Sequence, residues 1–298
     1  MKIVTLTLSP AVDIEYRLNQ FNPGGLNRTD SHSVSAGGKG INVSRAILRC
    51  AARFAGKDPE KRSFELKTVA PVGGETGEMI RRILESEGIA LTAVPVAENT
   101  RVNVSVIPDE GKSVEINAPG TPVGDALDGI EAAVLDGIGP GDCVVIAGSC
   151  PKDVPKSYPS ELVGKVKETG ATAVLDCDGE ALRIAVSADV KPDLIKPNNE
   201  ELAALTGCDP DDRNSLVKAA ESLGIGTVVT TLAGDGSILT SRGKSAFFPT
   251  VKRPVVRLKG AGDTFLGAFV YARFVRQDSP EDAMVFASKV AGDYVAGE

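Results

Sequence analysis

Residues 260–269 read GAGDTFLGAF, and they carry the strongest local signal in the sequence. Three small residues precede an apolar run that predicts a buried helix over about 261–276. Such a start presents unpaired N–H groups and the positive end of the helix dipole, which suits the charge on a transferring phosphoryl group. Asp263 lies in the first turn, where it can accept a proton from an attacking hydroxyl. The segment alone also fits a plain turn followed by an acid that stabilises the helix start.

On the N-terminal side of this stretch, short strand-like runs alternate with helical patterns. The strand-like runs lie at 3–8, 69–72, 143–147, 173–176, 194–196 and 227–232. The helical patterns lie at 41–50, 78–87, 125–136, 158–169, 200–206 and 216–223. Several strands are uniformly apolar, so the alternation predicts an α/β fold with a mostly parallel central sheet covered by helices on both faces. Right-handed crossovers then bring the carboxyl ends of the strands to one edge, where ligands bind.

Three segments, at 13–18, 101–107 and 113–117, differ from the apolar strands and helical patterns, because they alternate apolar and polar residues. A period of two predicts a sheet with one wet face and one buried face. We expect residues 12–36 and 92–118 to form a small β-sheet lid, and residues 1–11, 37–91 and 119–298 to form the α/β core. The alternative is that the three segments are edge strands of the main sheet.

The composition excludes several classes of protein. The chain has 298 residues, of which 42% are hydrophobic and 24% charged, as expected for a folded protein with a sizeable core. The formal net charge of −7 argues against nucleic-acid binding. No apolar run approaches the ~20 residues that span a bilayer, and the N-terminus lacks the features of a signal peptide. We therefore expect a cytoplasmic protein with no membrane partner.

The cysteines and the single histidine offer little for catalysis. The cysteines lie apart, at 50, 143, 150, 177 and 208, with no CxxC pair. We expect them to be small buried side chains rather than zinc ligands or disulfide partners. A histidine-based triad would depend on His32, which lies in an ordinary polar stretch.

A second glycine-rich turn, AGGKGIN at 36–42, also opens a helical pattern. Its glycines let a ligand approach the backbone, while Lys39 offers a cation and Asn42 an amide. The turn does not fit the Walker A pattern of the P-loop. Turns of this kind also precede helices that bind nothing.

A third feature is the sequence KPNNEE at 196–201. A predicted strand ends at Lys196, and Asn198 fits the N-cap of a helix that has Glu201 at its third position. This pair has two interpretations. It can form a capping box, or its oxygens can organise magnesium and the waters around it.

In this order, the motifs resemble the ribokinase-type (PfkB) carbohydrate kinase family along nearly the whole chain. The matching pieces are TLSPAVD at 7–13, GGKGIN at 37–42, the Asn198/Glu201 pair and GAGD at 260–263. Within the family, the chain is similar to the bacterial phosphosugar kinases at residues 27–28, 100–101, 174–176 and 179–182. The resemblance implies a ribokinase-like fold with a small β-sheet lid, and a homodimer in which the two lids pack together.

The resemblance also implies roles at the reacting centre. Asp263 is expected to be the catalytic base. The backbone amides around it are expected to form the anion hole, at Gly260, Ala261, Gly262 and Asp263 itself. Residues expected to bind ATP are Lys196, Thr231, Gly234 and Gly236. Asn198 and Glu201 are expected to hold magnesium through water.

The substrate side of the site follows from the same resemblance. Residues expected near the sugar hydroxyls are Asp13, Gly38 and Asn42. Residues expected around the phosphate already on the substrate are Arg28, Lys39, Arg101 and Ser149. Arg28 and Arg101 each fall on a predicted lid strand, where an arginine can equally be part of a solvated face.

The implied activity is ATP- and magnesium-dependent phosphorylation of a ketohexose phosphate. Fructose 1-phosphate, giving fructose 1,6-bisphosphate, is the first expectation, and tagatose 6-phosphate and fructose 6-phosphate are the alternatives. Leu26 stands where some kinases of fructose 6-phosphate have lysine, which disfavours that substrate. The rival of a different class is a non-catalytic phosphosugar-binding regulator, and the intact Asp263 and Asn198/Glu201 pair argue against it.

Two positions depart from the family's pattern. Ala233 stands at the first glycine of the nucleotide loop Thr-x-Gly-x-x-Gly, so it is expected to restrict the approach of the backbone to ATP. Arg257 stands where many relatives have aspartate or asparagine, so activation by potassium is not implied.

Overall fold

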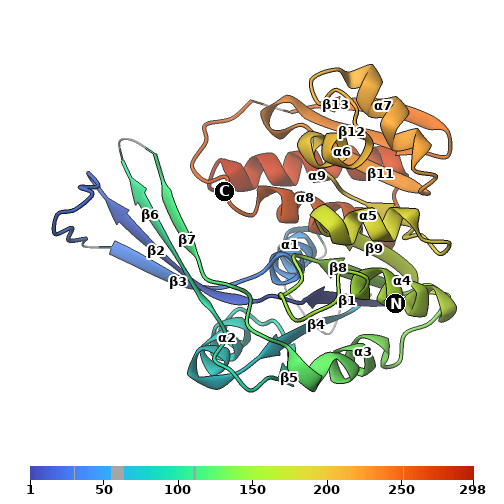
Figure 1. Cartoon of the computed structure of the whole chain (residues 1–298). Helices are drawn as coiled ribbons and strands as arrows, with labels where there is room; N and C mark the ends of the chain where they lie inside the picture. The colour runs from blue at the N-terminus through green and yellow to red at the C-terminus, as the bar shows by residue number, and fades with distance from the viewer. Residues whose placement is uncertain (30, 55–63, 110–111, 251) are drawn as a thin grey trace.

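A nine-stranded sheet forms the body of the molecule in the computed structural model, which describes residues 1–29, 31–54, 64–109, 112–250 and 252–298 (Figure 1). The strand order is β13-β12-β11-β10-β9-β8-β1-β4-β5. In chain order the strands are β1 (Lys2–Thr7), β4 (Glu65–Val72), β5 (Leu91–Pro95), β8 (Cys143–Ala147), β9 (Thr172–Asp176), β10 (Leu194–Ile195), β11 (Thr227–Thr231), β12 (Gly236–Ser241) and β13 (Lys244–Pro249). The predicted α/β fold with a large central sheet is confirmed.

The strands from β5 to β11 pair in parallel, and β12 and β13 add an antiparallel hairpin at one edge. The central strand β1 lies between β4 and β8. Side chains of β1 and β8 alternate between two apolar cores, so that Ile3 and Val145 face one core and Leu6 and Ile146 face the other. This two-sided burial explains why these strands read as uniformly apolar.

Helices cover both faces of the sheet. One core contains residues of α1 (Lys39–Phe54), α8 (Ala261–Val270) and α9 (Pro280–Val295). The opposite core contains residues of α3 (Leu127–Leu135), α4 (Tyr158–Glu168), α5 (Gly179–Ser187), α6 (Asn199–Thr206) and α7 (Arg213–Ser222). Helix α2 (Gly74–Ser86) packs with α1 and β4 in a third cluster that extends to the base of the second sheet.

Helix α8 is shorter than the helix predicted over 261–276. The α-helix ends at Val270, and the chain continues as a π-helical turn, η4 (Tyr271–Val275). The N–H of Arg276 donates to the carbonyl of Tyr271, five residues earlier, which marks the wider turn.

The second sheet, called the lid below, has the strand order β3-β2-β6-β7 and projects from the body (Figure 1). Its strands are β2 (Ala11–Leu18), β3 (Ser31–Gly37), β6 (Val102–Pro108) and β7 (Val114–Asn117). The alternating segments therefore form a separate sheet rather than edge strands of the main one. One boundary was wrong, because residues 92–95, predicted in the lid, belong to β5 of the main sheet, where Val94 is buried in the core.

Two further observations concern the sequence-based expectations. Cys50, Cys143 and Cys177 are buried as expected, whereas Cys150 and Cys208 are only partly buried. Within the described residues, no helix is both long enough and apolar enough to cross a membrane.

Candidate active site

Helix α8 begins at the carboxyl edge of the main sheet, and its first turn is open. Its N-cap, Gly260, has φ +84°, and no side chain caps the helix. A side chain at Gly260 would be strained in this left-handed conformation, and its Cβ would lie 2.9 Å from the hydroxyl of Tyr294. In the part of the chain that the structure describes, the N–H groups of Gly262 and Asp263 have no hydrogen-bond partner. Such a helix start can bind an anion.

One amide of the predicted anion hole is used differently. The N–H of Ala261 donates to the carbonyl of Leu258 at 3.1 Å, because the left-handed Gly260 turns the chain back on itself. The open amides are therefore those further into the first turn.

The carboxylate of Asp263 is held by the second glycine-rich segment. Asn42, near the start of α1, donates from Nδ2 to Oδ2 of Asp263 at 2.8 Å. Burial raises the pKa of the Asp263 carboxyl, although the hydrogen bond from Asn42 opposes the rise. Of the neighbouring charges, Asp176 raises this pKa, and Lys196 and Lys39 lower it. A carboxylate with a raised pKa is a better proton acceptor than an ordinary one.

Two lysines flank the buried carboxylate of Asp176 at the end of β9. Nζ of Lys39 lies 3.7 Å from Oδ1 of Asp176, and Nζ of Lys196 lies 3.3 Å from Oδ2. Lys196 also lies over the first turn of α8, 3.6 Å from where a Cβ on Gly262 would be. Burial by itself lowers the pKa of Lys39, but nearby carboxylates, Asp176 foremost, raise it overall. The ammonium of Lys196 thus lies close to the open amides, and that of Lys39 acts on the Asp263 carboxyl of the same turn.

The lid contributes Asp13 to the same edge. Its Oδ1 accepts a hydrogen bond from Nδ2 of Asn103 on β6 at 2.9 Å, and its Oδ2 pairs with Nζ of Lys259 at 3.0 Å. Lys259 directly precedes Gly260, so this ion pair joins the lid to the loop that opens α8. Gly38 lies against Thr7 at the end of β1, where a side chain would overlap that of Thr7.

Three predicted phosphate ligands lie in different surroundings. Arg101 lies one residue before β6 rather than on the strand, and its guanidinium donates to the carbonyls of Ser9, Pro10 and Ala118 at 3.0–3.3 Å. Ser149 is exposed just after β8. Arg28 is exposed in the loop between β2 and β3. This loop lies at the outer end of the lid (Figure 1), and the structure does not bring Arg28 to the other site residues.

The Asn198/Glu201 pair forms a capping box at the start of α6. The N–H of Glu201 donates to Oδ1 of Asn198 at 2.7 Å, and the N–H of Asn198 donates to Oε2 of Glu201 at 2.8 Å. Asn198 also pairs with Thr231 in an isolated parallel bridge, and Thr231 donates to the carbonyl of Pro197 at 3.0 Å. The predicted magnesium and nucleotide residues are therefore neighbours.

The loop after β11 has the backbone expected of a glycine-rich turn. Ala233 adopts φ +48°, in the left-handed region that favours glycine, and it begins the short 3₁₀ turn η3 (Ala233–Asp235). Gly236 has φ +127°, and a side chain there would collide with the carbonyl of Phe248. Gly234 has open space around it.

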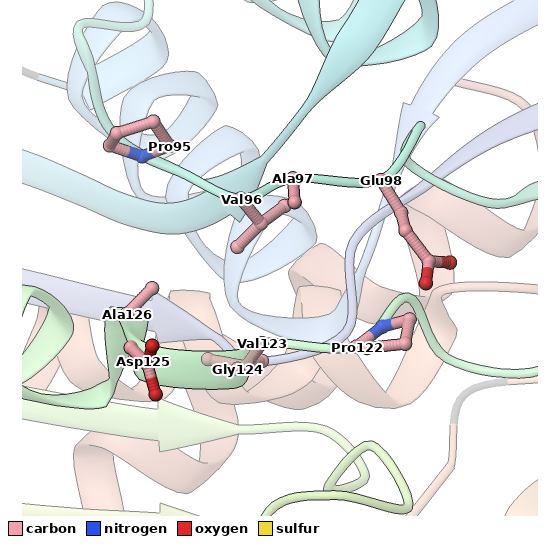
Figure 2. Close-up of a pocket in the computed structure, with 9 residues that line it drawn as sticks. All are labelled: Pro95, Val96, Ala97, Glu98, Pro122, Val123, Gly124, Asp125 and Ala126. Carbon is pink, nitrogen blue, oxygen red and sulfur yellow. The ribbon is translucent and has the colours of Figure 1, made fainter.

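A cavity of about 560 Å³ lies elsewhere, between residues 95–98 and 122–126 (Figure 2). These segments belong to the two connections between β5 and β6 and between β7 and α3, which join the lid to the body. None of the predicted site residues lines this cavity. The predicted site is therefore separate from this cavity.

Sequence reasoning did not single out Asp176, Lys259 or Asn103 as site residues. Asp176 had a detectable signal, because it is an acid at the end of a uniformly apolar strand at the binding edge. Lys259 and Asn103 have ordinary sequence contexts, and they reach the site through contacts between distant parts of the chain.

A half-buried carboxylate beside an open helix start and two lysines fits a phosphotransferase, which needs a base and an anion-stabilising environment. Comparison with known proteins agrees with this class. Residues 6–295 match the pfkB family of carbohydrate kinases, and the chain belongs to that family. The predicted family and enzyme class, a phosphosugar kinase, are confirmed.

Three relatives illustrate the similarity. The chain is 33% identical to a 1-phosphofructokinase of Bacillus subtilis over 271 residues, which cover 90% of this chain and 84% of the relative. It is 30% identical to a tagatose-6-phosphate kinase of Staphylococcus epidermidis over 289 residues, covering 95% and 88% of the two chains. The structure of phosphofructokinase-2 from Escherichia coli in complex with substrates and products matches with a TM-score of 0.88 and 26% identity, covering 99% of this chain and 94% of the other.

Proposed function

We propose that the protein is an ATP- and magnesium-dependent cytoplasmic kinase that phosphorylates fructose 1-phosphate to fructose 1,6-bisphosphate. The observation that carries this proposal is the Asp263 carboxylate, bound by Asn42 beside the open first turn of α8. The 1-phosphofructokinase relative supports fructose 1-phosphate as substrate. The tagatose-6-phosphate kinase relative makes tagatose 6-phosphate one alternative, and a structure of Escherichia coli phosphofructokinase-2 in complex with fructose-6-phosphate makes fructose 6-phosphate the other.

In the proposed reaction, Asp263 accepts the proton of the sugar hydroxyl. The hydroxyl oxygen attacks the γ-phosphorus of ATP in line with the leaving group. The bond between the γ-phosphorus and the β–γ bridging oxygen breaks, and ADP leaves with the electron pair. Charge on the transferring phosphoryl group faces the amides of Gly262 and Asp263, with the ammonium of Lys196 over the same turn. These fixed groups lower the barrier because they are in place before the charge develops.

The phosphate already on the sugar is assigned to Lys39, whose side chain is 33% exposed and so can reach a ligand. Arg101 can assist, because its three hydrogen bonds leave two of the five guanidinium N–H groups free for a ligand. Asp13 would exchange its contact with Lys259 for a sugar hydroxyl. A neutral sugar would leave these cations without an anion, which favours a phosphosugar.

Magnesium fits the residues near α6. Oε2 of Glu201 accepts the hydrogen bond of the capping box, which leaves Oε1 to hold a metal-bound water. Oxygen ligands are those that magnesium prefers, and it commonly keeps several waters and binds substrate phosphates. Among the described residues, no group of three or more His, Cys, Asp or Glu side chains could hold a metal ion, in keeping with binding through water. When bound, the ion would neutralise charge on the nucleotide phosphates.

The test is a coupled assay of ADP release with fructose 1-phosphate, fructose 6-phosphate and tagatose 6-phosphate. We expect the highest kcat/KM with fructose 1-phosphate. A higher value with either other sugar would replace the substrate and keep the enzyme class. Binding of a sugar phosphate without any turnover would identify a non-catalytic regulator instead.

We also propose a homodimer through the lid. On one face of this sheet, four apolar residues lie side by side in register: Val34, Ile14, Val104 and Ile116. Val34 is 41% exposed and Ile116 62% exposed. Exposed apolar rows of this kind mark interaction surfaces, and a small sheet needs packing on this face. The opposite face carries Asp13, so the paired lids would leave the site side free.

Light scattering tests the dimer. Val104→Lys should give monomers with a raised KM for the sugar phosphate, because the lid loses its support. Glu115→Lys, on the opposite face of the same sheet, is the control and should remain dimeric. A wild-type monomer that is fully active at the assay concentration would disprove the proposal.

A further inference from the structure

The side-chain amide of Asn42 is held from both ends. Its Nδ2 donates to Oδ2 of Asp263 at 2.8 Å, and its Oδ1 accepts from Nη1 of Arg45 at 3.0 Å. A guanidinium only donates hydrogen bonds and an ionised carboxylate only accepts them. The amide is therefore satisfied in one orientation, with its oxygen toward Arg45 and its nitrogen toward Asp263. Rotated by 180°, it would place its oxygen against the carboxylate.

Arg45 is itself fixed by a bidentate contact. Its Nε donates to Oε2 of Glu87 at 2.6 Å, and its Nη2 donates to Oε1 of Glu87 at 3.1 Å. Its Nη1 also donates to the carbonyl of Ala36 at 2.6 Å. The side chain of Arg45 is only 14% exposed. A planar guanidinium held at three of its nitrogens has little freedom to turn.

These contacts join three parts of the fold at one side chain. Arg45 and Asn42 lie on α1, Glu87 caps the end of α2, and Ala36 is the penultimate residue of lid strand β3. The contacts run from the surface at Glu87, through Arg45 and Asn42, to the carboxylate at the reacting centre. Neither Arg45 nor Glu87 is among the residues expected to contact substrate.

We propose that Arg45, fixed by Glu87, is a positioning residue that holds the Asn42 amide in the orientation in which it donates to Asp263. The proposal rests on the proposed role of Asp263 as the catalytic base. Without Arg45, the oxygen of the Asn42 amide loses its partner, and the amide gains freedom to rotate away from the carboxylate. The base is then held less well and its anion is less stabilised.

The test compares kcat and its pH dependence in Arg45→Met and wild type. We expect kcat to fall about 3- to 10-fold, the range for a lost hydrogen bond, with the KM for ATP within about twofold. The hydrogen bond from Asn42 lowers the pKa of Asp263, so weakening it should move the acidic limb of the kcat profile to higher pH. The charges of Asp176, Lys196 and Lys39, which also face Asp263, stay in place in the variant.

Three further variants sharpen the test. Arg45→Lys keeps the charge but lacks the planar fork, so it should not restore the profile. Glu87→Gln keeps Arg45 but weakens the bidentate contact that fixes it. We expect the acidic limb to move to higher pH, by less than in Arg45→Met. This variant replaces Arg45→Met in the test if Arg45→Met folds poorly. The matched control is Arg81→Met, which breaks a bidentate surface pair with Glu78 on α2 that has no connection to Asn42.

The inference is overturned if Arg45→Met and Glu87→Gln behave like Arg81→Met. It is also overturned if kcat falls with no movement of the acidic limb, because a purely structural role would do that. Failure of the proposed function looks different. In that case wild type turns over none of the three sugar phosphates, or Asp263→Asn remains active.

Discussion

Helices α6 and α8 start at the same edge of the sheet, and each has an acidic residue at its third position, but their first turns are used in opposite ways. In α6, the side chains of Asn198 and Glu201 satisfy each other's backbone N–H groups. In α8, the N-cap is Gly260, which has no side chain, and Asp263 contacts Asn42 on another helix instead of folding back.

The N-cap residue accounts for the difference. An asparagine N-cap accepts a hydrogen bond from an amide of the first turn and stabilises the helix. A glycine N-cap leaves the amides open, so stability is lost and an anion site is gained. Both helices thus have an acid three residues after the N-cap, but the asparagine N-cap closes the first turn of α6 and the glycine N-cap leaves the first turn of α8 open. Three substitutions, one of them used in two experiments, test this contrast.

The largest effect is expected from Asp263→Asn. The fold and the binding of both substrates should persist, while kcat falls by roughly 10²–10⁴ because the general base is lost. Steady-state kinetics with calorimetric binding of ATP and sugar phosphate separates the two properties. A variant within a few-fold of wild type would mean that the acid of α8 only stabilises its helix.

A smaller effect on activity is expected from Gly260→Ala. The left-handed φ and the contact with Tyr294 would displace the first turn, and we expect kcat to fall by roughly tenfold with a stability loss of about 1 kcal/mol or more. The control is Gly207→Ala at the C-cap of α6, where φ is +76° and a Cβ meets open space. Denaturant unfolding should show losses in both variants. Equal kinetics in the two would disprove a role for the open turn.

The third test concerns the closed turn. Asn198→Ala removes a capping side chain and should cost about 0.5–2 kcal/mol. Asp212→Ala removes the cap of α7, which accepts from Asn214 and Ser215, and should cost a similar amount. Only Asn198→Ala should also raise the magnesium concentration needed for half-maximal activity. If the two variants share one magnesium dependence, capping is the whole role of Asn198.

The smallest effect is expected on the way in which the stability of the fold depends on pH. Because the pKa of Asp263 is raised on folding, the folded state binds its proton more tightly than the unfolded chain does. This residue therefore favours folding below the ordinary pKa of aspartate, and that contribution is lost as pH rises through the raised value. Asp263→Asn should melt at a higher temperature than wild type at neutral pH, with the difference shrinking in acid. A melting temperature of Asp263→Asn below that of wild type at neutral pH would contradict this prediction.

Periodicity predicted most of the fold. The apolar runs located β1, β4, β8, β9 and β11, and the alternating segments located the lid, because burial on two faces or on one leaves a direct record in the sequence. Residues 92–95 were assigned to the lid because a five-residue edge strand has too short a pattern to separate it from its neighbours. The π-helical turn at 271–275 leaves no such record.

The site was predictable only in part. Motif order indicated Asp263, Asn42 and Lys39, and the structure brings these three to one edge. The order of the motifs could not show that Asn42 binds Asp263, because that contact joins residues far apart in sequence. Arg101 shows the limit most clearly. An arginine at the lid boundary fits a phosphate ligand, and no local pattern indicates the three backbone carbonyls that it also holds.

The parallel pairing of β2 with β6 constrains when the protein can first bind its substrate. During synthesis, β2 and β3 emerge early, but alone they are a two-stranded ribbon, which is marginal in water. Asp13 gains its neighbour Asn103 only when β6 has been made, and the base on α8 follows close to the end of the chain. A nascent chain therefore exposes an unfinished lid until β6 and β7 have been made, and the site lacks its base until α8 has left the ribosome, so a complete substrate site cannot assist folding before then.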